Sequence, residues 1–429
     1  MHAGSWLPAM STKPHTLTAA LRAWFAPPRS HGEVLEERQA SPLELFYDLV
    51  YVVIIAQISH TLAKHPDWEG FGHFAIVFSL VWVAWLNGTY YHDYHGRDDG
   101  SNRVIIFTHM LLLVVLAVFA AHAADDADDG RGFSITYSVL FAVIALQWLS
   151  LYWIDNLGIG RIIIGYSAAM WLMAGIMVAA SIVESPEVRL GLWAGVVAIM
   201  IAGMVFAVFG TDPQHEEHFA VTEALAERFA LLTIIVLGEV VVGVVNGMSE
   251  GSHGAMEVGT GLLLLNNGFA FWWNIFDFVG RKAPRPGAVY RMVWTLFYLP
   301  LWLCIAAAGA GMVPLVQHAT DDLAPTGAAW LVTGATAGML LSLSGLVLTM
   351  PTHPGIKFTP FTLVFAAALA LVVGAMRPMP IVLAACLNVI LSLPWLEAFV
   401  RHARAGIPLG FQAELHRGVS GGKTVRPGP

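Results

Sequence analysis

Stretches of about 20 predominantly apolar residues recur along almost the whole chain, and they constrain its fold more than any other feature. A helix of that length crosses the ~30 Å hydrocarbon core of a bilayer. Of the 429 residues, 57% are hydrophobic and only 12% are charged, whereas soluble domains have about 25% charged residues. We therefore predict an all-α, polytopic membrane protein with about twelve transmembrane helices. The expected spans are 43–63, 71–91, 104–122, 133–154, 162–183, 190–209, 224–246, 258–279, 290–313, 327–349, 359–376 and 379–399.

The distribution of basic residues predicts how these helices are oriented. Lys and Arg are enriched in cytoplasmic loops. If the N-terminus is cytoplasmic, only four of the 22 basic residues lie on the outer side, namely Lys64, Arg131, Arg189 and Arg377. We therefore expect both termini to be cytoplasmic, which requires an even number of spans.

Two similar patterns suggest an internal duplication. Glu44-Leu-Phe46 begins the first expected span and Glu227-Arg-Phe229 begins the seventh. A Trp-x-Asn motif follows each, so that Asn87 and Asn274 come 43 and 47 residues after the two glutamates. Parallel repeats of this kind are common in secondary transporters; the alternative is a chance similarity between two amphipathic helix starts. We predict a cytoplasmic arm over 1–40, a first six-helix repeat over 41–210, a second over 211–402 and a cytoplasmic tail over 403–429.

The same motifs resemble a known family. Residues 44–52 (ELFYDLVYV) with Trp85-Leu-Asn87, and residues 226–239 (AERFALLTIIVLGE) with 271–277 (FWWNIFD), are similar to the bacterial low temperature requirement protein A (LtrA) family. This resemblance covers most of the chain. It implies a multi-pass protein of the bacterial inner membrane that is linked by name to growth in the cold, and it leaves the substrate open. The chain departs from the family pattern at residues 90–96 (YYHDYHG), which are richer in histidine.

Acidic residues within the expected spans are the first candidates for function. An ionisable group inside a bilayer costs several kcal/mol and usually faces the helix bundle or a water-filled cavity. Glu44 and Asp48 lie one turn apart on one face of the first span. Glu239 lies deep in the seventh span, between apolar residues and directly after Gly238. These positions indicate proton or cation sites at the interface between the repeats.

A structural interpretation competes with this one. Arg228 could form an ion pair with Glu44 or Asp48 across the two halves, and the asparagines could bond between helices as packing contacts. The tryptophans Trp85, Trp272 and Trp273 could belong to the interfacial aromatic belt. In the functional interpretation, Arg228 is the counter-charge of a transport pathway. That pathway comprises Glu44, Asp48, Asn87, Glu227, Arg228, Glu239, Asn274 and Asp277.

Histidine pairs offer weak candidates for a metal site. His92 with His95 and His215 with His218 are i, i+3 pairs beside carboxylates. Together they could hold Zn²⁺ tetrahedrally if the two cytoplasmic loops met. Their spacing differs from the His-Glu-x-x-His of metalloproteases, so we expect no metal and no cofactor. In the third span, His109 is either an interhelical packing residue or a proton relay.

The remaining motifs narrow the function class. The chain lacks a phosphate-binding Gly-x-x-x-x-Gly-Lys-Ser/Thr loop and a Gly-x-Ser-x-Gly elbow, and we identify no catalytic residue. A net charge of −8 argues against a nucleic-acid partner. We therefore expect a transporter of an ion or small solute, with proton coupling as an option, whose partners are that ion or solute and the lipid bilayer. The alternatives are a non-transporting membrane factor that supports growth at low temperature and an intramembrane enzyme acting on a lipid. The sequence leaves the oligomeric state open.

Overall fold

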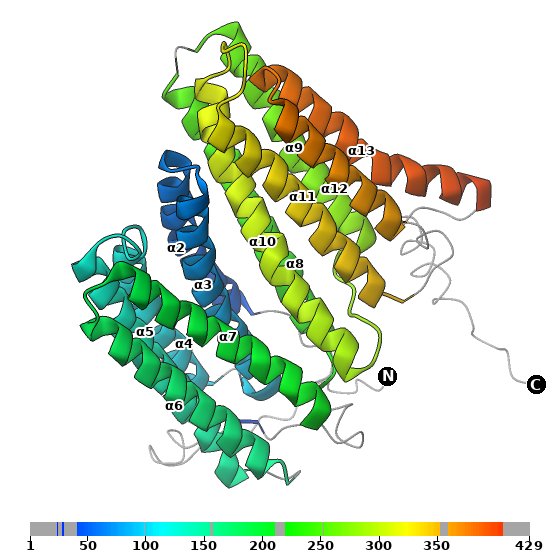
Figure 1. Cartoon of the computed structure of the whole chain (residues 1–429). Coiled ribbons are helices and arrows are strands. Elements are labelled where there is room, and N and C mark those ends of the chain that lie inside the picture. The colour runs from blue at the N-terminus through cyan, green and yellow to red at the C-terminus, as the bar shows by residue number, and fades with distance from the viewer. Residues whose placement is uncertain are drawn as a thin grey trace, which may run out of the picture.

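A computed structural model describes residues 24, 28–29, 41–97, 99–154, 158–210, 219–251, 253–351 and 359–405. This part of the chain contains twelve long α-helices and no strand, and each expected span has its own helix (Figure 1). The helices are α2 (Pro42–Lys64), α3 (Trp68–His95), α4 (Gly100–Ala120), α5 (Ala127–Ser150), α6 (Gly160–Ile182), α7 (Pro186–Gly210), α8 (Glu223–Ser249), α9 (Ala255–Phe278), α10 (Ala288–Gln317), α11 (Thr326–Thr349), α12 (Thr359–Met376) and α13 (Pro380–Ala405). A short 3₁₀ helix, η1 (Leu151–Ile154), follows α5.

Eleven helices of the described part are long and apolar enough to cross a membrane. The helix that falls short is α9. It has 24 residues, as many as α11, but Asn266, Asn267 and Asn274 interrupt its apolar stretch. The closely spaced α12 and α13 are separate helices of 18 and 26 residues, and both are among the eleven.

Capping residues fix where α2 and α8 begin. The backbone N–H of Glu44 donates to Ser41 Oγ at 3.2 Å, and the N–H of Ser41 donates to the Glu44 carboxylate at 3.0 Å. This reciprocal capping box satisfies two amides that a helix start would otherwise leave unpaired. At α8, Thr222 Oγ1 accepts the N–H of Leu225 at 2.9 Å. The first carboxylate of α2 is therefore explained by the start of the helix.

Part of the N-terminal arm is bonded to the C-terminal end of α3. Arg29 Nη2 donates to the carbonyl of Asp93 at 2.5 Å, and Arg29 Nε donates to that of Gly96 at 2.7 Å. A cation is favourable there because the last carbonyls of a helix have no partner within the helix. The arm predicted over 1–40 is thus attached to the helix bundle at Arg29.

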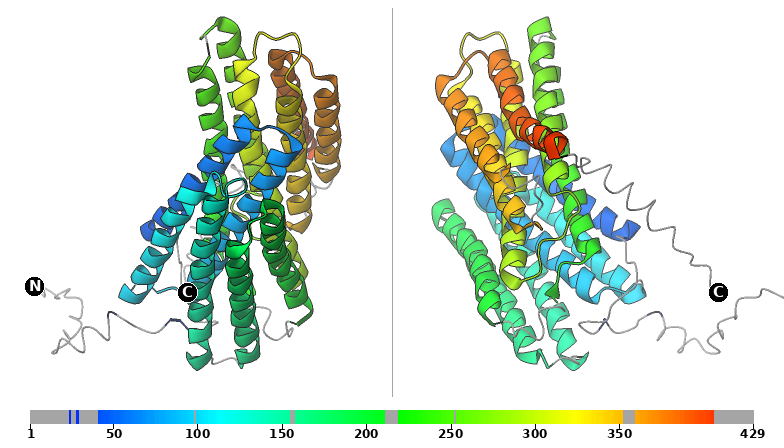
Figure 2. Two further views of the ribbon diagram at one scale, coloured as in Figure 1. Left: turned by 60° about the vertical axis from the view of Figure 1, so that its left-hand side comes forward. Right: turned by 90° about the vertical axis from the view of Figure 1, so that its right-hand side faces the viewer.

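The helices form two groups, α2–α7 and α8–α13, which Figure 1 shows side by side and Figure 2 shows from two further directions. In the first group α2 packs against α3 and α4, and then α4 against α5, α5 against α6, α6 against α7, and α7 against α3. In the second group α8 packs against α9 and α10, and then α10 against α11, α11 against α12, α12 against α13, and α13 against α9. The groups meet where α2, α3 and α7 contact α10 and where α2 and α3 contact α8.

Glycines allow α8 and α10 to cross at very close range. A Cβ added to Gly309 of α10 would lie 2.6 Å from the carbonyl oxygen of Glu239, and one added to Gly243 of α8 would overlap the carbonyl of Gly309. Only glycine fits such a backbone contact without displacing a helix. This crossing therefore fixes the backbone of Glu239 against α10.

Candidate functional site

An ion pair between Asp48 of α2 and Arg228 of α8 joins the two helix groups. Arg228 Nη2 donates to Asp48 Oδ1 at 2.7 Å, and the side chains are 2% and 0% exposed, respectively. Trp85 Nε1 of α3 donates to the same oxygen at 2.8 Å. Of the two acidic partners considered for Arg228 in the sequence, Glu44 and Asp48, the structure thus pairs it with Asp48. Both charges are out of contact with bulk solvent.

Aromatic side chains enclose this pair. The Arg228 guanidinium lies 6.0 Å from the centre of the Trp85 ring, a distance at which cation–π attraction operates. The Trp85 ring lies 4.9 Å from Phe229 and 5.1 Å from Trp302. Trp85 is fully buried, which does not fit the interfacial belt that was one interpretation of the sequence. In contrast, Trp272 and Trp273 are exposed on α9.

Not all polar atoms of this ion pair form hydrogen bonds. Asp48 Oδ2 and the Nε and Nη1 atoms of Arg228 are buried and have no hydrogen-bond partner within the described residues. Buried charges are stable when nearly all of their hydrogen-bonding capacity is used. The unused atoms of this pair therefore suit a third polar group, such as a water molecule or an ion.

Three further acidic residues of the expected pathway lie at helix ends or on the surface. Glu44 belongs to the capping box of α2. Glu227 Oε1 lies 3.7 Å from Arg281 Nη1, in the turn after α9, and both side chains are partly exposed. Asp277 is exposed and accepts a hydrogen bond from Trp273 Nε1 at 2.8 Å. Each of the three therefore has a hydrogen-bond or ion-pair partner among the described residues.

Glu239 differs from these residues. It is 5% exposed and lies 11 residues beyond Arg228 on α8, which places it about 16 Å further along the helix. It forms no ion pair or side-chain hydrogen bond with any residue in the described ranges. A buried carboxylate without a partner is costly within a membrane, and such residues commonly mark ion or proton pathways.

The two asparagines form contacts between helices, as the packing interpretation predicts. Asn87 Nδ2 donates to the Val83 carbonyl at 2.7 Å, and its Oδ1 accepts a hydrogen bond from Tyr166 of α6. Asn274 Nδ2 lies 2.8 Å from the Ala270 carbonyl and 2.9 Å from that of Leu391 on α13. Each asparagine therefore bonds both to its own helix, four residues back, and to a neighbouring helix.

The histidines considered for a metal site have other partners. His92 Nδ1 lies 3.0 Å from Asn102 Oδ1, and His95 Nδ1 lies 2.9 Å from the Arg29 carbonyl. His215 and His218 lie outside the described residues. Across the part of the chain that is described, no three side chains are grouped in a way that could hold a metal ion.

A buried polar cluster near Asp48 was only partly predicted from the sequence, which pointed to His92 and His109 but not to the tyrosines. The hydroxyls of Tyr47 and Tyr51 are 2.7 Å apart, and the Tyr47 ring lies 6.0 Å from that of His92 and 6.2 Å from that of His109. Neither ring nitrogen of His109 has a hydrogen-bond partner of good geometry among the described residues, and the same holds for the amide of Gln147. The i, i+4 tyrosines beside Asp48 were the available signal for this cluster.

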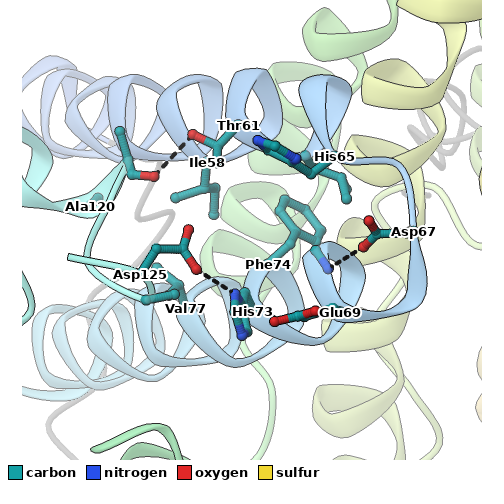
Figure 3. A pocket seen from close by; sticks show the side chains of 14 residues that line it. Ile58, Thr61, His65, Asp67, Glu69, His73, Phe74, Val77, Ala120 and Asp125 are labelled. Carbon is teal, nitrogen blue, oxygen red and sulfur yellow. Dashed lines mark hydrogen bonds and ion pairs between the residues drawn. The ribbon is translucent and has the colours of Figure 1, made fainter. Parts of the chain in front are cut away.

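A second polar region lies where the C-terminal end of α2 meets the N-terminal end of α3. A pocket of about 370 Å³ is lined by His65, Asp67, Glu69, His73 and Asp125, among others, and Figure 3 shows how these side chains lie. His73 Nδ1 and Asp125 Oδ1 are 2.9 Å apart, whereas Asp67 Oδ1 accepts the N–H of Gly70 and caps α3. In the predicted orientation this pocket faces the outside of the cell.

The chain is similar to a known protein family and to a bacterial relative. Residues 39–393 match the profile of a family described as "Bacterial low temperature requirement A protein (LtrA)". A protein of Rhizobium meliloti (strain 1021), itself described as uncharacterized, is 26% identical over 311 residues. That match covers 63% of this chain and 68% of the relative. No solved structure shows a significant match.

Proposed function

The chain belongs to the bacterial low temperature requirement A (LtrA) family, and we propose that it is an inner-membrane transport protein for a cation or a small cationic solute. The observation that supports this function most strongly is Glu239, a carboxylate buried in a membrane helix without a partner among the described residues. It lies on the same helix as Arg228, whose partner Asp48 belongs to the other helix group. The proposed pathway therefore runs along α8, between the two groups.

The two groups are proposed to be parallel six-helix repeats. Each of the six helix contacts described above for the first group has a counterpart, six helices later, in the second. Asn87 and Asn274 also bond to carbonyls four residues earlier on equivalent helices. This correspondence supports the duplication inferred from the sequence. Parallel repeats that can move relative to each other are a common basis for transport.

The charges suggest how the halves respond to a cation. Arg228 stays protonated in proteins, so Asp48 is neutralised by Arg228 unless another cation replaces it. Glu239 has no such partner and is neutralised by a proton or a transported cation. Transfer of a cation from Glu239 to Asp48 would weaken the contact of Asp48 with Arg228, and so loosen the contact between α2 and α8.

Both termini are proposed to lie on the cytoplasmic side of the membrane. The turn after α9 contains Arg281, Lys282 and Arg285, and the N-terminal arm reaches the neighbouring end of α3 through Arg29. Such a concentration of basic residues on one side fits the cytoplasmic face of the inner membrane.

One observation favours a second candidate function, a non-transporting membrane factor. Asp48 and Arg228 are paired with each other, and Glu44 and Glu227 also have partners. This is expected for charges that only hold helices together. Flux through reconstituted protein separates the two functions. We expect liposomes containing the protein to show H⁺, Na⁺ or K⁺ flux above that of protein-free liposomes, measured with internal indicator dyes. The absence of flux for all three cations would favour the membrane factor.

A further inference from the structure

A cavity of about 290 Å³ lies between the first helix group and α10. Its walls come from α3, α5, η1, α6, α7 and the first turns of α10. The lining is mostly aromatic and aliphatic, including Tyr90, Trp148, Tyr166 and Met204. Pockets of this size and composition bind apolar or amphipathic ligands.

The hydroxyl groups around the cavity already have partners. Tyr90 and Thr295 are linked through their hydroxyls at 2.7 Å, and the Tyr94 hydroxyl donates to the Phe219 carbonyl at 3.1 Å. These tyrosines therefore present mainly their rings to the cavity, which suits a hydrocarbon chain better than a polar solute.

Arg291 supplies a positive charge at one end of the cavity. Among the lining residues that the structure describes it is the only Lys or Arg, and it lies in the first turn of α10. Its Nη1 donates to the Phe219 carbonyl at 2.8 Å, and a guanidinium has five N–H donors in all. The guanidinium is thus held in place with donors left over for an anion.

The position of Arg291 along the helices fits the boundary of a bilayer. The basic residues Arg281, Lys282 and Arg285 precede α10, and the cavity also includes Met200, from within α7, and Tyr166, from within α6. Basic pockets between membrane helices on the cytoplasmic side bind the head groups of anionic lipids.

We propose that this cavity is a binding site for an anionic phospholipid, with one acyl chain between the helix groups and the phosphate on Arg291. The acyl chain would pack against the apolar walls, and the guanidinium–phosphate contact selects for negative charge. The bound lipid would contact both α7 and α10, and so would occupy the joint between the two groups. This site is independent of whether the protein transports a cation.

Native mass spectrometry of the detergent-purified full chain tests the site. The probes are phosphatidylglycerol, phosphatidylcholine with the same chains, and oleate. We expect wild-type protein to retain phosphatidylglycerol over phosphatidylcholine, and Arg291→Gln to reduce that retention about tenfold. Arg281→Gln is the matched control, because Arg281 is 68% exposed and lies outside the cavity; it should bind like wild type.

A second variant keeps the test decisive if Arg291→Gln does not fold. Met204→Trp fills the cavity from α7 and should reduce phosphatidylglycerol binding while leaving the arginine in place. Equal retention of the two phospholipids by wild type, or unchanged binding in both variants, would overturn the proposal. Retention of oleate without phosphatidylglycerol would show that the site binds a free fatty acid and would equally overturn it.

Discussion

Arg228 of α8 donates a hydrogen bond to Asp48 of α2 at 2.7 Å, which places a fully buried ion pair at the contact between the two helix groups. The partners are 180 residues apart in the chain. Their pairing therefore depends on the association of the two halves and reports on it directly.

Removing one partner of this pair should be much worse than removing both. Asp48→Asn or Arg228→Gln alone leaves an uncompensated buried charge and should cost about 3–5 kcal/mol. The double variant leaves no net charge, so its loss should be smaller than the loss in either single variant. Thermal unfolding in detergent measures all four proteins. Strictly additive losses would show that the two side chains do not interact in the folded protein.

The crossing of α8 and α10 gives a second prediction. Gly309→Ala places a methyl group against the Glu239 backbone, and such overpacking should cost about 1–3 kcal/mol of stability. The matched control is Gly334→Ala in α11, where a Cβ meets no atom within 4 Å. There alanine should stabilise the helix by up to about 1 kcal/mol, because it restricts the unfolded chain more than glycine does. Melting temperatures that fall equally in both variants would contradict the close crossing.

Asp126 should make the stability of α5 depend on pH. The N–H groups of Asp129 and Asp128 donate to Asp126 Oδ1 and hold the pKa of this carboxyl below its usual value. A depressed folded-state pKa adds stability above the unfolded pKa of about 3.9, and this is lost as pH falls through the folded value. Asp126→Ala should therefore lower the melting temperature at neutral pH, with a smaller difference in acid. Asp126→Asn, which can still cap the helix, is the control. A deficit of Asp126→Ala that is independent of pH would exclude a contribution from the carboxylate charge.

Much of the fold follows from the sequence because membrane helices are defined locally. Hydropathy alone predicted a span over 43–63, and α2 runs from Pro42 to Lys64. The capping pattern of Ser41 and Glu44 is also local and can be read directly. In α9, however, the three asparagines weaken the signal, and only the packing of this helix against α8 and α13 shows its place in the bundle.

The site was less predictable, because it depends on which side chains meet across helices. The sequence offered Arg228 two acidic partners, and only the packing of α2 against α8 selects Asp48. Likewise, Glu227 pairs with Arg281 because the turn after α9 reaches the start of α8. The cluster of Tyr47, His92, His109 and Gln147 comes from four different helices, so no local spacing describes it.

Glu239 is proposed to serve a cation pathway, and cation flux through paired glutamate variants tests this role most directly. Glu239→Gln preserves the size of the side chain but cannot be deprotonated, whereas Glu227→Gln changes a partly exposed glutamate on the same helix that pairs with Arg281. We predict that Glu239→Gln reduces cation flux in proteoliposomes by at least about tenfold, and that Glu227→Gln retains most of it. Equal flux through wild type and Glu239→Gln would contradict the account.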